Sequence, residues 1–402
     1  MRGRHGFLCG VLSMKSGGIL LLSATLLSAH VKWEAATESA PWSACRAATV
    51  LRDTLWVVDS AAWFSTDGAS WVPRGGPPWW PRTGFALEVF ENKVWVMGGR
   101  DTSGYRNDVW NSPDFVNWTQ MTGSAQWSGR AWHRSVAFNG RIWVLGGHDG
   151  SNALNDVWWS SDGASWTLSG LAPWFPRYRH AAVALGGAIW VFGGRSTSGS
   201  RPRDVWFSSD GVSWTQASGS APWAQRDGHA AAALAGLMWV MGGEGDSGLL
   251  NDVWYGQGTP DTAEWSPRTE HSGFVFRDKL WVLGGSGEGG HKRDVWFTGG
   301  LGVAEGAGSP SDRTRVFGVC PSVIRTSAEI HLSTGLTEAA LDICDMAGNV
   351  VKTLAGCVVS RYRGRVAWDG RDERGQTVPP GVYVVRVRST GGTQVAKVVK
   401  LQ

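Results

Sequence analysis

The chain has 402 residues, of which 42% are apolar and 18% charged, and its formal net charge is +4 at pH 7. A chain of this length and apolar content can bury a large core, and 56 glycines against 16 prolines indicate many turns rather than low complexity. The weak net charge excludes the basic footprint of a nucleic-acid-binding surface, so we expect no nucleic-acid partner.

The N-terminus has the pattern of an export signal. The 13-residue apolar run 17–29 follows a segment that carries three cations and no anion. This run is shorter than a membrane-spanning helix and fits the core of a signal peptide, with cleavage expected near Ala29. Either Met1 or Met14 can serve as the start of a complete signal. We therefore predict that residues 1–29 are a signal peptide, that the protein is secreted or on the cell surface of a bacterial envelope, and that it has no transmembrane segment.

One segment recurs five times beyond the first 80 residues. It consists of an apolar strand ending in Trp-Val-x-Gly-Gly, a polar loop, and Asp-Val-Trp followed in most copies by an Asp-Gly turn. The glycine pairs are 48, 47, 49 and 42 residues apart and begin at Gly98, Gly146, Gly193, Gly242 and Gly284. This period is typical of one propeller blade and excludes short solenoid repeats. Including a degenerate first copy, six tryptophans mark the strand: Trp56, Trp95, Trp143, Trp190, Trp239 and Trp281.

The outer strand of the last blade is missing from its place after the sixth copy. Five tryptophans mark outer strands elsewhere, at Trp71, Trp118, Trp166, Trp214 and Trp265. The segment 31–42 parallels 213–223 and supplies Trp33 as the sixth. We therefore predict a six-bladed β-propeller over residues 30–300, closed by an N-terminal strand so that no edge stays open.

Three segments of the fourth copy resemble the kelch family of β-propellers. They are Arg177-Tyr178-Arg179-His180, the strand 189–194 with its Trp-Val-Phe-Gly-Gly, and Asp204-Val205-Trp206. Tryptophan replaces the tyrosine usual in the kelch strand. The resemblance implies an all-β, kelch-type propeller, a fold that serves both binding modules and enzymes.

After a linker at 301–312, alternating strands and turn signals predict a small β-sandwich over residues 313–402. The segments 368–375 and 379–383 resemble the Ig-like domain of the flagellar hook-capping family, a type also found in exported proteins, including type IX secretion cargo. The resemblance implies a sorting or anchoring domain that contacts secretion machinery. Its acidic residues Asp369, Asp372 and Glu373 suit either a hydrogen-bonded turn, which we favour, or a calcium site. The pairing of Cys45, Cys320, Cys344 and Cys357 is left open.

An arginine stands about 13 residues before the Trp-Val tryptophan in five blades, in a loop on the face where we expect a ligand. These arginines are Arg82, Arg130, Arg177, Arg226 and Arg268. Arginine binds carboxylates and phosphates bidentately, so the series is a candidate ligand-binding face. It can also be structural, bonding loop carbonyls while a nearby Pro-Trp element fills the seam between blades. Because the pattern repeats in every copy, we favour the structural role.

Residues that differ among the copies are better candidates for a binding site. They follow the glycine pairs on the same face and include Arg100, Tyr105, His148, Asp149, Arg195 and Glu244. Functional residues concentrate in such loops on a rigid scaffold. Four histidines share one repeat position, His133, His180, His229 and His271, but they form no metal-binding motif and fit a packing role. We expect no metal and no cofactor.

The sequence thus favours a secreted or cell-surface binding module whose partner is an extracellular glycan or protein, with peptide as the alternative ligand chemistry. The competing function is an enzyme of the sialic acid mutarotase kind, which needs a carboxylate beside an arginine at the channel mouth. Glu244 near Arg226 is the pairing we nominate. A copper radical oxidase requires a Cys–Tyr cross-link and several tyrosine ligands, which this propeller does not supply. No catalytic residue is assigned.

Overall fold

The computed structural model describes residues 31–234, 236–255 and 260–299 and, in the C-terminal part, 317–320, 323–324, 328–332, 339–344, 350–355, 365–379, 381–389 and 392–400. Within these ranges there is no helix, and so none long and apolar enough to cross a membrane. The expected signal peptide, the linker 301–312 and Cys357 lie outside them. The chain divides into two compact units, one with all strands up to residue 298 and one with all strands from residue 317.

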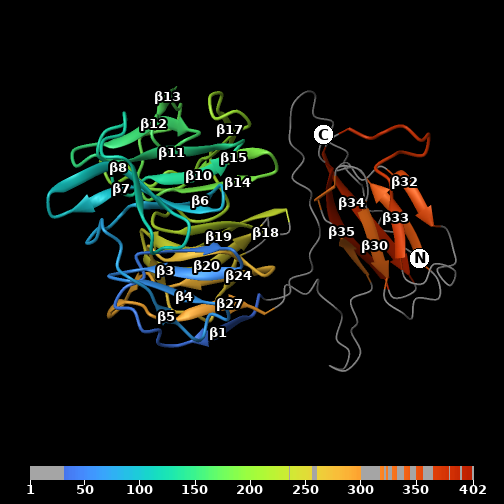
Figure 1. Cartoon of the computed structure of the whole chain (residues 1–402), viewed down its shortest axis with the longest axis horizontal. Helices are drawn as coiled ribbons and strands as arrows, with labels where there is room; N and C mark the ends of the chain where they lie inside the picture. The colour runs from blue at the N-terminus through green and yellow to red at the C-terminus, as the bar shows by residue number, and fades with distance from the viewer. Residues whose placement is uncertain are drawn as a thin grey trace, which may run out of the picture. The chain divides into compact units, whose positions relative to one another are not determined.

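The first unit contains six four-stranded antiparallel sheets, which we number as blades one to six (Figure 1). Blade one consists of β2 (Ala47–Leu51), β3 (Thr54–Val58), β4 (Ala62–Ser65) and β5 (Val72–Pro73). Blade two consists of β6 (Ala86–Phe90), β7 (Lys93–Asp101), β8 (Gly104–Ser112) and β9 (Thr119–Thr122). Blade three consists of β10 (Arg134–Phe138), β11 (Arg141–His148), β12 (Ala153–Ser160) and β13 (Thr167–Leu171). Blades four and five are β14 (Ala181–Leu185), β15 (Ala188–Phe192), β16 (Val205–Ser208), β17 (Thr215–Ser218); and β18 (Ala230–Leu234), β19 (Leu237–Gly245), β20 (Gly248–Tyr255), β21 (Asp261–Thr262). Blade six is β23 (Ser272–Phe276), β24 (Lys279–Leu283), β27 (Val295–Thr298) and β1 (Trp33–Thr37).

The blades are arranged as a β-propeller. The first strand of each blade contacts the first strands of two other blades, and these contacts close a circle through β2, β6, β10, β14, β18 and β23. These six innermost strands surround the central channel. Three short strands add a small sheet beside blade six: β22 (Arg268–Thr269), β25 (Ser286–Gly287) and β26 (Gly290–His291).

The outer strand of blade six comes from the N-terminal end of the chain, as predicted. Strand β1 pairs antiparallel with β27, with Trp33 opposite Thr298 (Figure 1). The backbone N–H of Trp33 donates to Glu264 Oε2 at 3.0 Å, and its ring is 2% exposed. The strand therefore covers the open edge of β27 and ties the two ends of the propeller together.

Trp265 corrects our assignment of the outer-strand tryptophans. In blades one to four a tryptophan stands immediately before the outer strand, whereas β21, the outer strand of blade five, follows Pro260. Trp265 instead lies three residues before Arg268, as Trp127 lies before Arg130, and it packs edge-to-face on Trp33 at 5.9 Å. The equivalent residue Trp127 is buried among side chains of blades two and three. The tryptophans that precede the innermost strands thus fill the seams between blades, as the structural interpretation of the Pro-Trp element expected.

The Trp-Val-x-Gly-Gly strand is continuous and apolar because neighbouring blades cover both faces of each middle strand. Val94, Val96 and Met97 of β7 are fully buried, and Trp95 donates its indole N–H to Phe90 O at 3.0 Å. Gly98 follows at φ 55°, and a Cβ there would lie 2.9 Å from a backbone oxygen of the next blade. The glycine pair is therefore required both by conformation and by close approach.

The C-terminal unit is an Ig-like fold of two sheets. One has the order β28 (Phe317–Cys320), β30 (Ala328–Leu332), β33 (Arg365–Trp368), and the other has the order β29 (Val323–Ile324), β35 (Gly392–Lys400), β34 (Gly381–Ser389), β31 (Ala339–Cys344), β32 (Val350–Ala355). Trp368 is buried against Tyr383 with ring centroids 5.3 Å apart. Asp372 Oδ1 accepts hydrogen bonds from the backbone N–H groups of Arg374 and Gln376, both at 2.9 Å. Asp372 therefore forms the hydrogen-bonded turn that we favoured over a calcium site.

Candidate functional site

The five repeated arginines are built into the blades. In blade four, Arg177 Nη1 and Nη2 donate to the two carboxylate oxygens of Asp204 at 2.8 and 2.9 Å, and Nη1 also donates to Gly193 O at 3.0 Å. Asp204 Oδ2 in turn accepts the indole N–H of Trp206 at 2.7 Å. The same arrangement joins Arg82 to Asp108, Arg130 to Asp156, Arg226 to Asp252 and Arg268 to Asp294.

Each of these arginine side chains is at most 4% exposed. Each guanidinium group makes bidentate, charge-assisted hydrogen bonds to a carboxylate of its own blade, so these donors are not available to a ligand. This supports the structural role that we favoured for the arginine series over a ligand-binding role. It also removes the pairing nominated for an enzyme, because Arg226 is held by Asp252 while Glu244 Oε1 lies 3.3 Å from a different arginine, Arg201.

The four repeated histidines are buried and neutral. Burial first, and then the neighbouring buried arginines, lower the pKa of His133 and His271 to about 3 and hold the pKa of His180 and His229 well below the usual range. Phe85 takes the same position in blade two, which fits a packing role. Within the described ranges, no group of three or more His, Cys, Asp or Glu side chains is placed to hold a metal ion.

One repeat position forms a hydrogen-bonded backbone arc around the channel mouth. It lies two residues after each buried arginine and is occupied by Gly84, Trp132, Arg179, Gly228 and Glu270, all with φ between 52° and 63°. Each of the last four donates its N–H to the carbonyl oxygen of the member before it in this series, at 2.6 to 2.9 Å. We call these five residues the mouth arc. Its backbone conformation is the same in five blades, whereas its residue is glycine in two of them and tryptophan, arginine or glutamate in the other three.

The three non-glycine members of the mouth arc touch one another in sequence. The Arg179 guanidinium lies over the Trp132 ring, 5.3 Å from its centroid. Arg179 Nη2 is 2.8 Å from Glu270 Oε1, and both side chains are partly exposed, at 25% and 35%. A Cβ on Gly84 would lie 3.1 Å from Trp132 Nε1, so the indole packs over that glycine. The side chains thus cross the mouth from blade two to blade six.

Four half-exposed rings, of which Trp132 is one, form a closed cluster. Tyr105 lies 6.4 Å from Trp132 and 6.0 Å from His148, and Tyr178 lies 6.2 Å from Trp132 and 5.0 Å from His148, between ring centroids. The exposed Arg100 places its guanidinium 5.6 Å from the Tyr105 ring. We call these four rings the aromatic cluster. It joins the loops of blades two, three and four.

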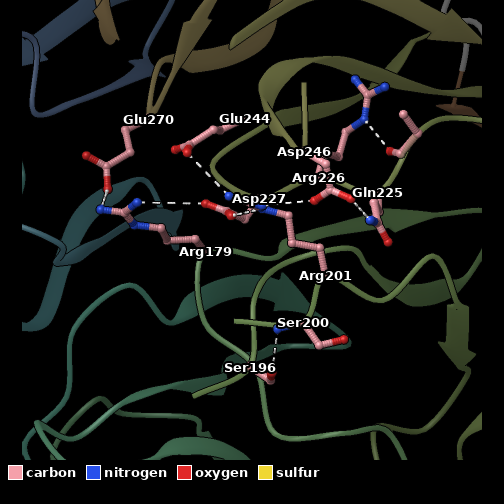
Figure 2. Close-up of polar contacts among 11 residues, drawn as sticks. Arg179, Ser196, Ser200, Arg201, Gln225, Arg226, Asp227, Glu244, Asp246 and Glu270 are labelled. Carbon is pink, nitrogen blue, oxygen red and sulfur yellow. Dashed lines mark hydrogen bonds and ion pairs between the residues drawn. The ribbon is translucent and has the colours of Figure 1, made fainter. Parts of the chain in front are cut away.

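Arg179 also belongs to an ionic network (Figure 2). Asp227 is fully buried and accepts from Arg201 Nε at 2.6 Å, with Arg179 Nη1 3.7 Å away. Arg201 also lies 3.3 Å from Glu244 and 3.1 Å from Asp246, whose side chains are 36% and 59% exposed. Two guanidinium groups here face four carboxylates, those of Asp227, Glu244, Asp246 and Glu270, which leaves a formal charge of −2.

A hollow of about 740 Å³ opens next to this network. Its lining includes Leu249, Ser266, Glu288 and Lys292. Leu249 is the cross-strand partner of Glu244 in blade five, so the hollow borders the carboxylate side of the mouth. The channel mouth therefore offers an aromatic side, a charged side and an adjacent open volume.

Deeper in the propeller, Glu88 of the innermost strand β6 reaches the next blade. Its Oε2 is 3.4 Å from Ser135 Oγ on β10. Burial raises the pKa of Glu88 to about 8, against the lowering effect of hydrogen bonds from Val89, Ser135 and Ala137. This carboxyl group is consequently protonated in much of the neutral range.

The variable residues expected to form a site occupy equivalent places. Backbone bridges fix Arg100 to Thr83, His148 to Ala131, Arg195 to Tyr178 and Glu244 to Asp227. The structure brings Arg100, Tyr105 and His148 to the aromatic cluster and Glu244 to the ionic network. Asp149 shapes its own loop instead, because its Oδ1 accepts the N–H groups of Ser151 and Asn152 at 2.8 and 2.7 Å.

Sequence reasoning missed Trp132, Arg179 and Glu270, the side chains at the centre of the mouth. Non-glycine residues rarely adopt a left-handed backbone, so nothing in their own identity marks them. The signal was present at Gly84 and Gly228, which stand at the same repeat position and indicate a positive φ there.

Comparison with known proteins agrees with this architecture. A kelch motif model matches residues 130–159, and a FlgD Ig-like domain model matches residues 322–393. A solved structure titled "Structure of YjhT" is similar over 65% of this chain and 96% of that chain, with a TM-score of 0.56 and 16% sequence identity. No protein of curated function matches the sequence. The fold is thus a kelch-type β-propeller followed by an Ig-like domain.

Proposed function

We propose that this kelch-repeat propeller is a secreted or cell-surface binding module, and that it takes a glycan or peptide ligand at the channel mouth. One observation carries the proposal. Five blades share a rigid backbone and buried Arg–Asp pairs, yet the residues of the mouth arc and of the loops after the glycine pairs differ and gather on one face. Variable side chains on a fixed scaffold are the usual form of a recognition surface.

The proposed location follows from the ends of the chain. The apolar run 17–29 would be removed as a signal peptide, leaving residue 30 just ahead of the closing strand β1. The Ig-like domain would then sort or anchor the protein through contacts with secretion machinery. Mass measurement of the exported protein tests this, since we expect a mature chain beginning at residue 30, and an intact N-terminus would contradict it.

An enzyme of the mutarotase kind stays a second candidate because two carboxylates lie beside arginines at the mouth. Glu270 is 2.8 Å from Arg179, and Glu244 is 3.3 Å from Arg201. Turnover of sialic acid anomers by the wild-type protein, lost on changing Glu270→Gln, would favour this function over a binding module.

A combined glycan and peptide array tests the binding function with the chain from residue 30 onward. The matched variants are Arg100→Ala with Asp246→Ala, exposed at the mouth, and Arg277→Ala with Asp53→Ala. The second pair lies in the β2–β3 and β23–β24 turns, at the other end of the channel, and is also exposed. We expect the mouth variant alone to lose binding. Equal binding by both variants would contradict the assigned face.

A further inference from the structure

We propose that the channel mouth recognises an uncharged sugar, with a pyranose ring laid on the aromatic cluster and its hydroxyl groups bound by Arg179, Glu270 and the ionic network. This inference rests on the proposed binding function and names the chemical class of its ligand.

The mouth side chains first stand out by the backbone position that they occupy. Trp132, Arg179 and Glu270 hold φ values of 52° to 55°, a conformation that costs free energy for any residue with a Cβ. Blades two and five have glycine at the same repeat position, Gly84 and Gly228. Three large side chains are therefore kept where glycine fits, and all three lie in one contact chain.

The arginines that lie over the aromatic cluster disfavour a cationic ligand there. An aromatic ring attracts a cation through its face, but guanidinium groups already lie over two of these rings. Arg179 is over Trp132 and Arg100 is over Tyr105. A lysine, arginine or quaternary ammonium ligand placed there would meet like charge at short range.

The ionic network likewise disfavours an anion. Arg179 and Arg201 are the cations of this network, and both are paired with carboxylates. The four carboxylates outnumber these two cations, and they still do when Arg134, whose charge also acts on Glu270 and Arg179, is counted as a third, so a carboxylate or phosphate group would be repelled.

A hydroxyl group suits the polar groups of this mouth, because it both donates and accepts hydrogen bonds and carries no charge. Glu270, Glu244 and Asp246 offer partly exposed carboxylate acceptors, and Arg179 offers donors beside them. Neighbouring hydroxyls of a pyranose can bond such a carboxylate and guanidinium together, while the apolar C–H face of the ring packs on an aromatic surface. The hollow bordered by Leu249 gives room for an adjoining sugar residue.

The test is saturation-transfer NMR on the mature full chain with separate probes. The neutral probes are galactose, glucose, mannose, fucose and N-acetylglucosamine, the anionic probes are N-acetylneuraminic acid and glucuronic acid, and the cationic probe is N-acetylarginine amide. We expect transfer to at least one neutral sugar and none to the charged probes. Transfer to a charged probe only would overturn the proposal.

Glycine substitutions separate recognition from folding. Trp132→Gly and Glu270→Gly install the residue that blades two and five carry at this backbone position, so the arc should keep its conformation. We expect each variant to weaken sugar binding at least tenfold. Trp159→Ala is the matched control, because Trp159 is a half-buried tryptophan of the same blade with Arg141 over its ring at 3.7 Å. Neutral sugar binding that survives both glycine variants would overturn the site.

The two levels of the proposal fail in different ways. Peptide hits on the array with no neutral sugar binding by NMR would refute the sugar ligand and leave the binding module standing. An array without any hit, together with no transfer to any probe, would refute both.

Discussion

The buried Arg–Asp pairs give the sharpest prediction about what holds this propeller together. Changing Asp204→Ala removes the carboxylate that accepts two bonds from Arg177, at 2.8 and 2.9 Å, and one from Trp206, at 2.7 Å. The Arg177 side chain is 0% exposed, so its charge cannot be transferred to water. The variant therefore leaves a buried cation without its counter-ion.

Removing one partner of a buried ion pair costs about 3–5 kcal/mol, because the remaining charge stays desolvated. In a domain of this size, each kcal/mol lowers the thermal midpoint by roughly 2–4 °C. We therefore expect the midpoint of the propeller to fall by about 6–20 °C. Changing Asp53→Ala is the matched control, because Asp53 and its partner Arg277 are 68% and 51% exposed and should leave the midpoint unchanged within error.

Tryptophan fluorescence follows the propeller selectively during heating, since of the 27 tryptophans only Trp368 lies beyond residue 300. If Asp204→Ala shifted the midpoint no more than Asp53→Ala, the repeated arginines would not depend on their carboxylates. The structural role assigned to the whole series would then be refuted.

Three further predictions concern protonation and closure. The pKa of His133 is lowered to about 3, so between about pH 6.5 and 3 the unfolded chain binds the extra proton, and this group lowers stability on acidification by up to about 1.4 kcal/mol per pH unit. His133→Phe, which copies Phe85, should make the fall of the thermal midpoint between pH 7 and 5 less steep, while His180, His229 and His271 still contribute to it. An equally steep decline would contradict this. The pKa of Glu88 is raised to about 8, so the folded chain binds the extra proton and stability falls as pH rises from about 4.5 to 8. In urea unfolding, the Glu88→Gln variant should no longer show this fall in stability. An unchanged pH profile would contradict the raised pKa. Trp33→Ala should lower the free energy of unfolding, measured with urea, by about 3–5 kcal/mol, because the buried Trp33 packs on Trp265. A decrease below about 1 kcal/mol would mean that β1 does not close the propeller.

The sequence was informative about whatever the blades share. Regular spacing located the strands, and the parallel between residues 31–42 and 213–223 located the closing strand, because both depend on side chains that repeat. The same regularity misplaced Trp265, because no tryptophan precedes β21 and the chain reaches Arg268 early. The three-residue spacing from Trp265 to Arg268, which Trp127 and Arg130 share, was the signal that places Trp265 in the seam.

Partners across a blade were harder to predict than strands. Asp204 follows Arg177 by 27 residues, and the other four pairs are 26 residues apart, a near-constant spacing that could have exposed the ion pairs. The contact between Arg179 and Glu270 has no such signal, because it joins different blades through residues with a left-handed backbone. A site formed by residues that differ among the repeats can be predicted only when the three-dimensional arrangement of the blades is known.

Hydrogen–deuterium exchange of the mature protein, with and without the ligand found by the array, tests the channel-mouth assignment most directly. We predict slower exchange in the loops that follow the glycine pairs, at residues 100–106, 148–153, 195–201 and 244–249. Slower exchange confined to the turns around residues 52–53 and 277–278, or to the strands from residue 317 onward, would contradict it.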